Sequence, residues 1–192
     1  GDRANHEVLN AYEQLRKYEK ENHLPALRHR IEHAQVIHPD DAPRLAKLNV
    51  IASMQPIHAT SDMLMADQFW GERAKLAYAW KAQLDFGAPL ALGSDAPVES
   101  PNPFWGLRAA VTRQRADGSP SADGWRAEQK LSMPEAFAGY TLGAAYAAHM
   151  EDRLGKLAPG FLADLIVLEQ DPFTCNPTEL LTLESSATMV NG

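Results

Sequence analysis

Three short segments that end in a histidine or an aspartate most constrain what this chain can fold into. The apolar run Pro89–Leu92 stops at Asp95 after a glycine and a serine, and two earlier strand-like segments end at His33 and His58. Short apolar runs bounded by glycine or proline are typical of buried parallel strands. Because α/β barrels place their chemistry at the carboxyl ends of such strands, the sequence predicts one polar site there, which we expect to hold a metal ion.

Segments with helical spacing separate these runs. Val8, Tyr12 and Leu15 recur at intervals of three and four and predict a helix over residues 5–21. Further helices are expected over residues 39–48, 72–86, 103–114 and 133–150, whereas residues 56–71 are expected to form a long connection. Alternating strands and helices indicate βαβ units and a parallel sheet. From Gly155 onward, turns and short strands predict a small β appendage.

Composition narrows the class of protein. The 192 residues have a hydrophobic fraction of 45% and a net charge of -7, with lysine and arginine dispersed, so we expect neither a nucleic-acid surface nor a membrane span. Cys175 is the single cysteine, which excludes an internal disulfide and favours a reducing compartment such as the cytoplasm. The chain begins at Gly1 and not at methionine, and we expect it to be a piece of a longer protein.

Each candidate residue also has a purely structural interpretation. His33 can be a metal ligand or a buried histidine bonded to the backbone, and His58 taken alone is more typical of a loop histidine. Asp95 can bind a metal and accept a proton from water, or it can cap the turn that follows it. Arg113 is expected to lie within a helix as a surface or ion-pair residue. The coincidence of three polar strand ends favours the site over the structural alternatives.

Several stretches along the whole chain carry a family resemblance. They are Gly1-Asp2-Arg3-Ala4, Arg28–Gln35, Ser53–Pro56, Leu92–Val98, Asn102–Trp105, Tyr140-Thr141 and Gly155–Asp164. Together they resemble the amidohydrolase superfamily, and more closely the amidohydrolase family 3 branch of YtcJ-like and N-substituted formamide deformylase-like proteins.

The resemblance implies a fold and a site. The α/β fold would be the C-terminal part of a (β/α)8 TIM barrel over residues 1–154, followed by part of a small β-sandwich over residues 155–192. By the same resemblance His33 matches a metal ligand on the sixth strand, and Asp95 matches a metal ligand and catalytic base on the eighth. His58 matches a substrate-side position on the seventh strand. The implied cofactor is a divalent metal, zinc being the expected one.

The implied activity is metal-dependent hydrolysis of an amide, formamide or cyclic amide C–N bond in a small molecule. The fifth-strand histidine and the His-x-His pair of the family are not in this chain, so we expect the missing N-terminal barrel half of the same gene product to be required and the fragment alone to be inactive. A non-catalytic, barrel-derived binding module is the alternative. A lysine-dependent barrel isomerase would need a strand-end lysine, which the sequence lacks. Formation of a homo-oligomer stays open.

Overall fold

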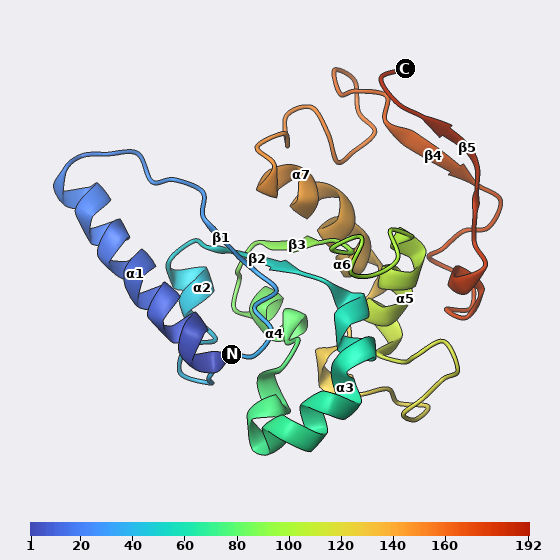
Figure 1. Ribbon diagram of the computed structural model, residues 1–192. Helices are drawn as coiled ribbons and strands as arrows, with labels where there is room; N and C mark the ends of the chain where they lie inside the picture. The colour runs from blue at the N-terminus through green and yellow to red at the C-terminus, as the bar shows by residue number, and fades with distance from the viewer.

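Two separate sheets organise the chain in the computed structural model, which describes residues 1–192. The larger sheet has three parallel strands in the order β1, β2, β3, and the smaller is the antiparallel pair of β4 and β5. In chain order the strands are β1 Arg30–Glu32, β2 Ile51–Met54, β3 Leu90–Leu92, β4 Leu165–Leu168 and β5 Ser185–Met189. The parallel strands lie at the centre of the molecule, and the antiparallel pair lies beside the C-terminus (Figure 1).

Helices alternate with the parallel strands, as the sequence predicted. They are α1 Asp2–Glu21, α2 Arg44–Lys47, α3 Pro56–Trp70, α4 Trp80–Asp85, α5 Pro103–Thr112, α6 Met133–Ala138 and α7 Ala144–Ala147, with 3-10 turns at η1 Gly71–Leu76, η2 Ala127–Gln129 and η4 Glu179–Leu181 and a π turn at η3 Gly139–Gly143. Helix α1 lies at one end of the molecule and the β4–β5 pair at the other (Figure 1). The α/β class is therefore confirmed.

The segment after β2 is a helix, so the prediction of a long connection over residues 56–71 is wrong. Pro56 occupies the first position of α3, where its missing N–H costs nothing. The buried face of α3 carries small or flexible side chains such as Ala59, Met63 and Ala66. Leu64 and Phe69 are exposed on other faces. Because apolar side chains occur on more than one face of α3, the sequence does not show the spacing of three and four residues that predicts an amphipathic helix.

The predicted helix over residues 72–86 is divided in two, into η1 and α4. Ala77, between them, pairs with Val36 in an isolated antiparallel bridge. The next residue, Tyr78, has a left-handed backbone with φ 51° and donates its N–H to the Gln35 carbonyl at 2.8 Å. The contact with residues that follow β1 thus interrupts the helix. Local sequence does not predict this interruption, because the contacting residues are distant along the chain. The helix predicted from residue 39 likewise begins only at Arg44.

The predicted helix over residues 133–150 contains a π turn and ends early, at Ala147. It starts at a capping box, in which the Glu135 N–H donates to Ser132 Oγ at 3.4 Å and the Ser132 N–H donates to Glu135 Oε2 at 2.7 Å. The π turn packs against β3. A Cβ on Gly143 would lie 2.0 Å from the Leu90 carbonyl oxygen, so only glycine permits this close approach.

Arg113 is fully buried, which corrects its expected place on the surface. Its Nε donates to the Trp125 carbonyl at 2.5 Å and its Nη1 to the Tyr78 carbonyl at 2.9 Å. The guanidinium also lies over the Trp80 and Trp125 rings, 4.3 and 4.9 Å from their centroids. Burial lowers the pKa of Arg113 to about 9, so the group is still charged at pH 7. Through these two hydrogen bonds, the Arg113 side chain connects the turn before α4 with the loop after α5.

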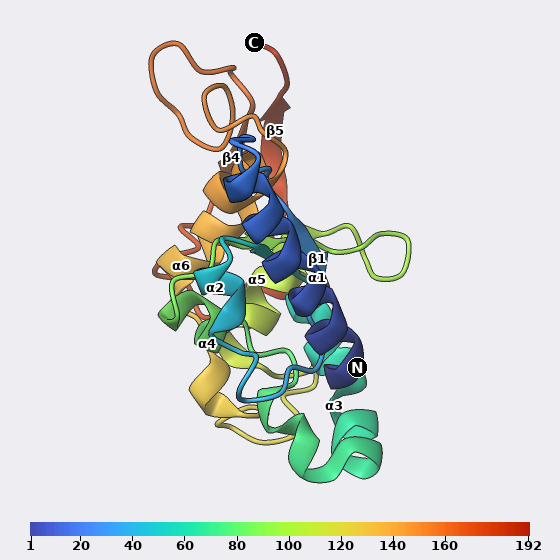
Figure 2. The ribbon, with the colours of Figure 1, turned by 90° about the vertical axis from the view of Figure 1, so that its left-hand side faces the viewer.

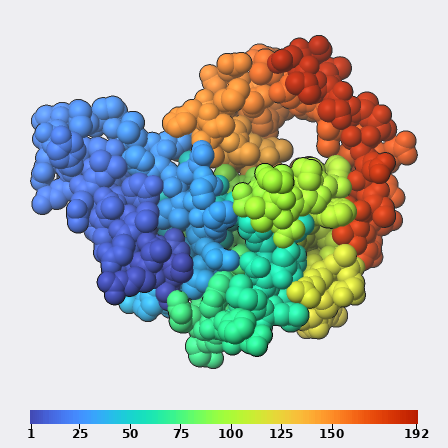
Figure 3. All heavy atoms as spheres, in the orientation of Figure 1, coloured from blue at the N-terminus to red at the C-terminus, as the bar shows by residue number.

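Residues after Gly155 pack unevenly against the rest of the chain, since Leu180 and Leu183 are buried in the core whereas the β4–β5 pair is largely exposed. Figure 3 shows this segment arching away from the body and leaving an opening beneath it. Side chains on both strands of the pair are exposed, including Ile166, Val167 and Met189. The predicted division at residues 154 and 155 stays a prediction. No helix combines the length and the apolar composition that crossing a membrane requires.

Replacing the buried arginine tests its part in the core. We expect Arg113→Ala to lower the free energy of unfolding by about 3 kcal/mol, because it leaves two carbonyls without a donor and a cavity between two indoles. Urea denaturation followed by circular dichroism measures this change. Arg3→Ala, on the exposed face of α1, is the matched control and should leave the midpoint where it was. Equal midpoints for the two variants would contradict the assignment.

An ion pair at the start of the sheet predicts an acid-sensitive contribution to stability. Arg28 binds both carboxylate oxygens of Glu151, at 2.7 and 3.0 Å. The hydrogen bond from Arg28 lowers the pKa of Glu151 to about 2. A lowered carboxyl pKa stabilises the folded state above the unfolded value of about 4.5, and this contribution is lost as the pH falls toward 2. Glu151→Gln should flatten the stability profile across that window, modestly because the pair is accessible to solvent. An unchanged profile would show that the pair contributes nothing.

Candidate metal centre

His33 directly follows β1 and turns the chain sharply. Its N–H donates to the Ser53 carbonyl at 2.7 Å, which extends the β1–β2 ladder by one bond. Its φ of 68° and the φ of 40° at Ala34 lie in the left-handed region. The imidazole Nδ1 lies 2.8 Å from Gln55 Oε1. The tautomer that donates from Nδ1 to this amide oxygen leaves a lone pair on Nε2, the form in which histidine binds metal ions.

His58 lies in the first turn of α3 and not in a loop. Pro56 starts the helix directly after β2, so the ring projects from a rigid element close to the strand end. The side chain is only 13% exposed, and its Nε2 is buried without a hydrogen-bond partner. Buried polar atoms without partners are rare, and each one requires an explanation. The His58 ring stacks on the His33 ring with centroids 5.7 Å apart.

Asp95 lies in the exposed loop that follows β3. This loop projects from the body of the molecule in the turned view (Figure 2). Asp95 has a left-handed φ of 58°, and its carbonyl accepts the Val98 N–H at 2.8 Å in a tight turn. Its Oδ2 lies 3.8 Å from His58 Nε2. The turn therefore directs the carboxylate back toward the histidines.

The three predicted strand-end residues come together in the structure. One ligand atom from each of His33, His58 and Asp95 lies within 4.8 Å of the other two. Two imidazole nitrogens and a carboxylate oxygen are ligands that zinc accepts. The unpartnered Nε2 of His58 and the free Nε2 lone pair of His33 also fit a cation or a polar substrate atom at this point. The geometry thus fits a divalent ion.

Sequence reasoning missed the polar side chains around this cluster. Gln55 orients His33, and the only local signal for it was its place at the end of β2. Asp62 accepts hydrogen bonds from Tyr78 Oη and from Gln35 Nε2. Burial and the bond to Asp62 raise the pKa of Tyr78, so its phenol stays protonated and donates. Asp62 lies one turn after His58, a relation that becomes visible only once residues 56–70 are known to be helical.

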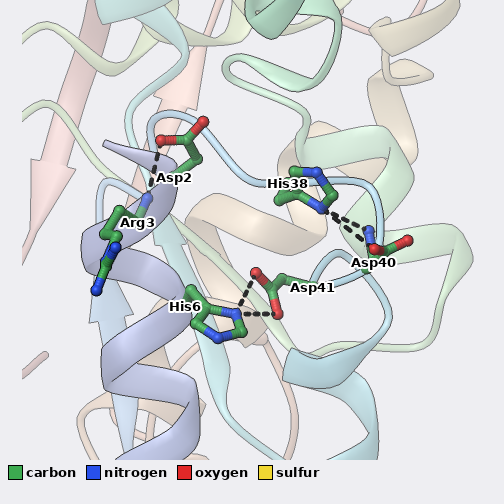
Figure 4. A pocket seen from close by; sticks show the side chains of 6 residues that line it. All are labelled: Asp2, Arg3, His6, His38, Asp40 and Asp41. Carbon is green, nitrogen blue, oxygen red and sulfur yellow. Dashed lines mark hydrogen bonds and ion pairs between the residues drawn. The ribbon is translucent and has the colours of Figure 1, made fainter.

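A second polar pocket lies elsewhere and shares no lining residue with the cluster. Its lining residues, drawn in Figure 4, are Asp2, Arg3, His6, His38, Asp40 and Asp41. His6 Nδ1 lies 2.9 Å from a carboxylate oxygen of Asp41, and Asp2 is held by Arg73 at 2.6 and 2.8 Å, which lowers the pKa of Asp2 to about 2. Asp2 therefore serves as an ion-pair residue at the start of α1.

Comparison with known proteins places the chain in a family. A sequence model described as the amidohydrolase family matches residues 1–192. The chain belongs to the amidohydrolase family. It is 36% identical to the putative amidohydrolase YtcJ of Bacillus subtilis (strain 168) over all of this chain and 35% of that protein. It is 27% identical to the N-substituted formamide deformylase of Arthrobacter pascens over 96% of this chain and 33% of that protein.

Two solved hydrolase structures share the fold of the chain. A metal-dependent hydrolase from Pyrococcus horikoshii matches with a TM-score of 0.77 and 30% identity, over 92% of this chain and 34% of that one. A mutant of the atrazine chlorohydrolase TrzN from Arthrobacter aurescens, complexed with zinc and atraton, matches with a TM-score of 0.58 and 25% identity, over 85% and 35%. The chain thus spans about a third of the length of these relatives and solved structures.

A matched pair of histidine variants tests the metal centre. His33 and His23 both have a left-handed backbone, which asparagine tolerates, and both are exposed. In the full-length protein we expect His33→Asn to weaken zinc binding by roughly tenfold or more and His23→Asn to leave it unchanged. Competition against a fluorescent chelator measures the affinity, and elemental analysis gives the bound stoichiometry. Equal zinc affinity in the two variants would remove His33 from the site.

Proposed function

We propose that the protein is a metal-dependent amidohydrolase that cleaves amide, formamide or cyclic amide C–N bonds of a small molecule. The convergence of His33, His58 and Asp95 within 4.8 Å carries this proposal. Family membership and the metal-dependent hydrolases of the same fold support it. The names of the two relatives, an amidohydrolase and a formamide deformylase, support the choice of bond.

The proposed metal ligands in this chain are His33 and Asp95, and the proposed ion is zinc. A zinc site generally has about three protein ligands and a water, so this chain would supply only part of the set. The remaining ligands would come from the N-terminal barrel half. Residues 1–154 would form the C-terminal part of the (β/α)8 barrel, and residues 155–192 part of a β-sandwich. On this basis we expect the isolated chain to bind metal weakly and to be inactive.

Asp95 would act as the general base. Its carboxylate is 39% exposed, so a water molecule can reach it. It would accept a proton from the attacking water and return that proton to the departing nitrogen. A divalent ion bound here would act as a Lewis acid, able to polarise the carbonyl and to bring the pKa of a water to about 7.

His58 would act on the substrate side of the site. Its Nε2 has no partner within the protein and lies 3.8 Å from the carboxylate of Asp95. A proton on this nitrogen could be donated to the carbonyl oxygen of the substrate, where negative charge develops during attack. The position on the first turn of α3 would keep the ring fixed, since helix backbone moves less than loop backbone.

Removing the proposed base tests the reaction. In the full-length, zinc-loaded protein we expect Asp95→Asn to lower kcat for a panel of small amides and formamides by about 10²- to 10⁴-fold. Because Asp95 is also a proposed ligand, turnover is expressed per bound zinc. Asp85→Asn, at the exposed end of α4, is the control and should retain full turnover. Wild-type turnover per zinc in the Asp95→Asn variant would refute its role as base.

A further inference from the structure

The pocket beside the two histidines carries a second group of polar side chains. It has a volume of about 300 Å³ and is lined by His33, Gln35, His58, Asp62, Val98 and Glu99. Asp62 and Glu99, which we call the outer acidic pair, follow His58 and Asp95 by four residues each. The outer acidic pair therefore lies next to the proposed reaction centre and has no part in the chemistry assigned above.

In each carboxylate of the outer acidic pair, one oxygen accepts hydrogen bonds from neighbouring side chains. The other oxygen has no hydrogen-bond donor. Asp62 Oδ2 accepts from Tyr78 Oη and from Gln35 Nε2, while Oδ1 has no donor. Glu99 Oε1 accepts from Ser61 Oγ at 2.5 Å, while Oε2 has no donor. The two side chains are thus positioned, and each keeps an acceptor for a ligand.

The basic side chains that line the pocket are the imidazoles of His33 and His58, both already assigned to the reaction centre. None of its lining residues is a lysine or an arginine. Arg115 is also close to Ser61, but its guanidinium donates to the backbone carbonyls of Thr60 and Ser61 at 3.0 and 3.2 Å and does not line the pocket. Two carboxylates in a small pocket favour a cation and repel an anion. The shape and charge therefore suit a compact, positively charged group.

We propose that Asp62 and Glu99 bind an ammonium or amidinium group of the substrate. The substrate would then be an amide or formamide with a positive charge a few bonds from the scissile carbonyl. This inference rests on the proposed function and adds the class of substrate to it. Gln35 and Tyr78 are positioning residues, since they act through Asp62.

Two formamides of equal length separate charge recognition from general binding. N-formylputrescine carries an ammonium group, and N-pentylformamide carries a methyl group at the same place. In the full-length, zinc-loaded protein we expect kcat/KM to be about tenfold higher for N-formylputrescine, chiefly through KM. Asp62→Asn and Glu99→Gln should each bring this ratio down toward one. Asp40→Asn, which removes an exposed carboxylate of the other polar pocket, should leave it unchanged.

The outcomes distinguish the two proposals. Equal kcat/KM for both compounds, or a ratio that survives both substitutions, would overturn the inference and leave the hydrolase proposal intact. If neither formamide is turned over, the hydrolase proposal loses its support, and calorimetric titration with putrescine decides the inference separately. Putrescine binding that Glu99→Gln weakens tenfold would support the outer acidic pair as an ammonium site, and the absence of binding would overturn it. Glu99 lies in an exposed loop, so this variant should fold even if Asp62→Asn disturbs Tyr78.

Discussion

The register of three short parallel strands is the constraint on which the candidate metal centre depends. Glu32 pairs with Ser53, and Ser53 pairs with Ala91, so the strands reach their carboxyl ends at nearly one level. The first residue beyond β1 is His33, whose N–H continues the ladder to the Ser53 carbonyl. A slip of one residue would turn each side chain to the opposite face of the sheet and move this histidine away from Gln55. The cluster exists only in this register.

Local sequence predicted the strand ends but not the helix that completes the pocket. A short apolar run with a break after it is visible in a few residues, which is why His33 and Asp95 could be selected. Helix α3 escaped detection because Leu64 and Phe69 place apolar side chains on its solvent side. Without the helix, Asp62 had no predicted relation to the site. Arg113 was missed for a different reason, since its partners lie in distant segments and only the folded chain brings them around it.

The packing of residues 155–192 favours the proposed place in a larger sandwich. Ile166 and Val167 are consecutive in β4, so their side chains leave opposite faces of the pair, and both are exposed. Two-stranded sheets are marginal in water unless other elements cover at least one face. Met189 on β5 adds to the uncovered apolar surface. The exposed apolar side chains of these strands are typical of a partly buried sheet. Further chain packed on them would bury these side chains and stabilise the pair.

Backbone conformation helps to explain how the strand ends direct their side chains to one place. His33 and Asp95 both have left-handed φ values, of 68° and 58°. This conformation costs a residue with a side chain about 1 kcal/mol, a cost that glycine would avoid. His33 and Asp95 therefore adopt a costly backbone conformation where they follow β1 and β3. This conformation directs the imidazole and the carboxylate toward a common point. Left-handed residues also occur away from the strand ends, for example at His23 and Tyr78, so the conformation supports the site only together with the convergence of the side chains that it directs.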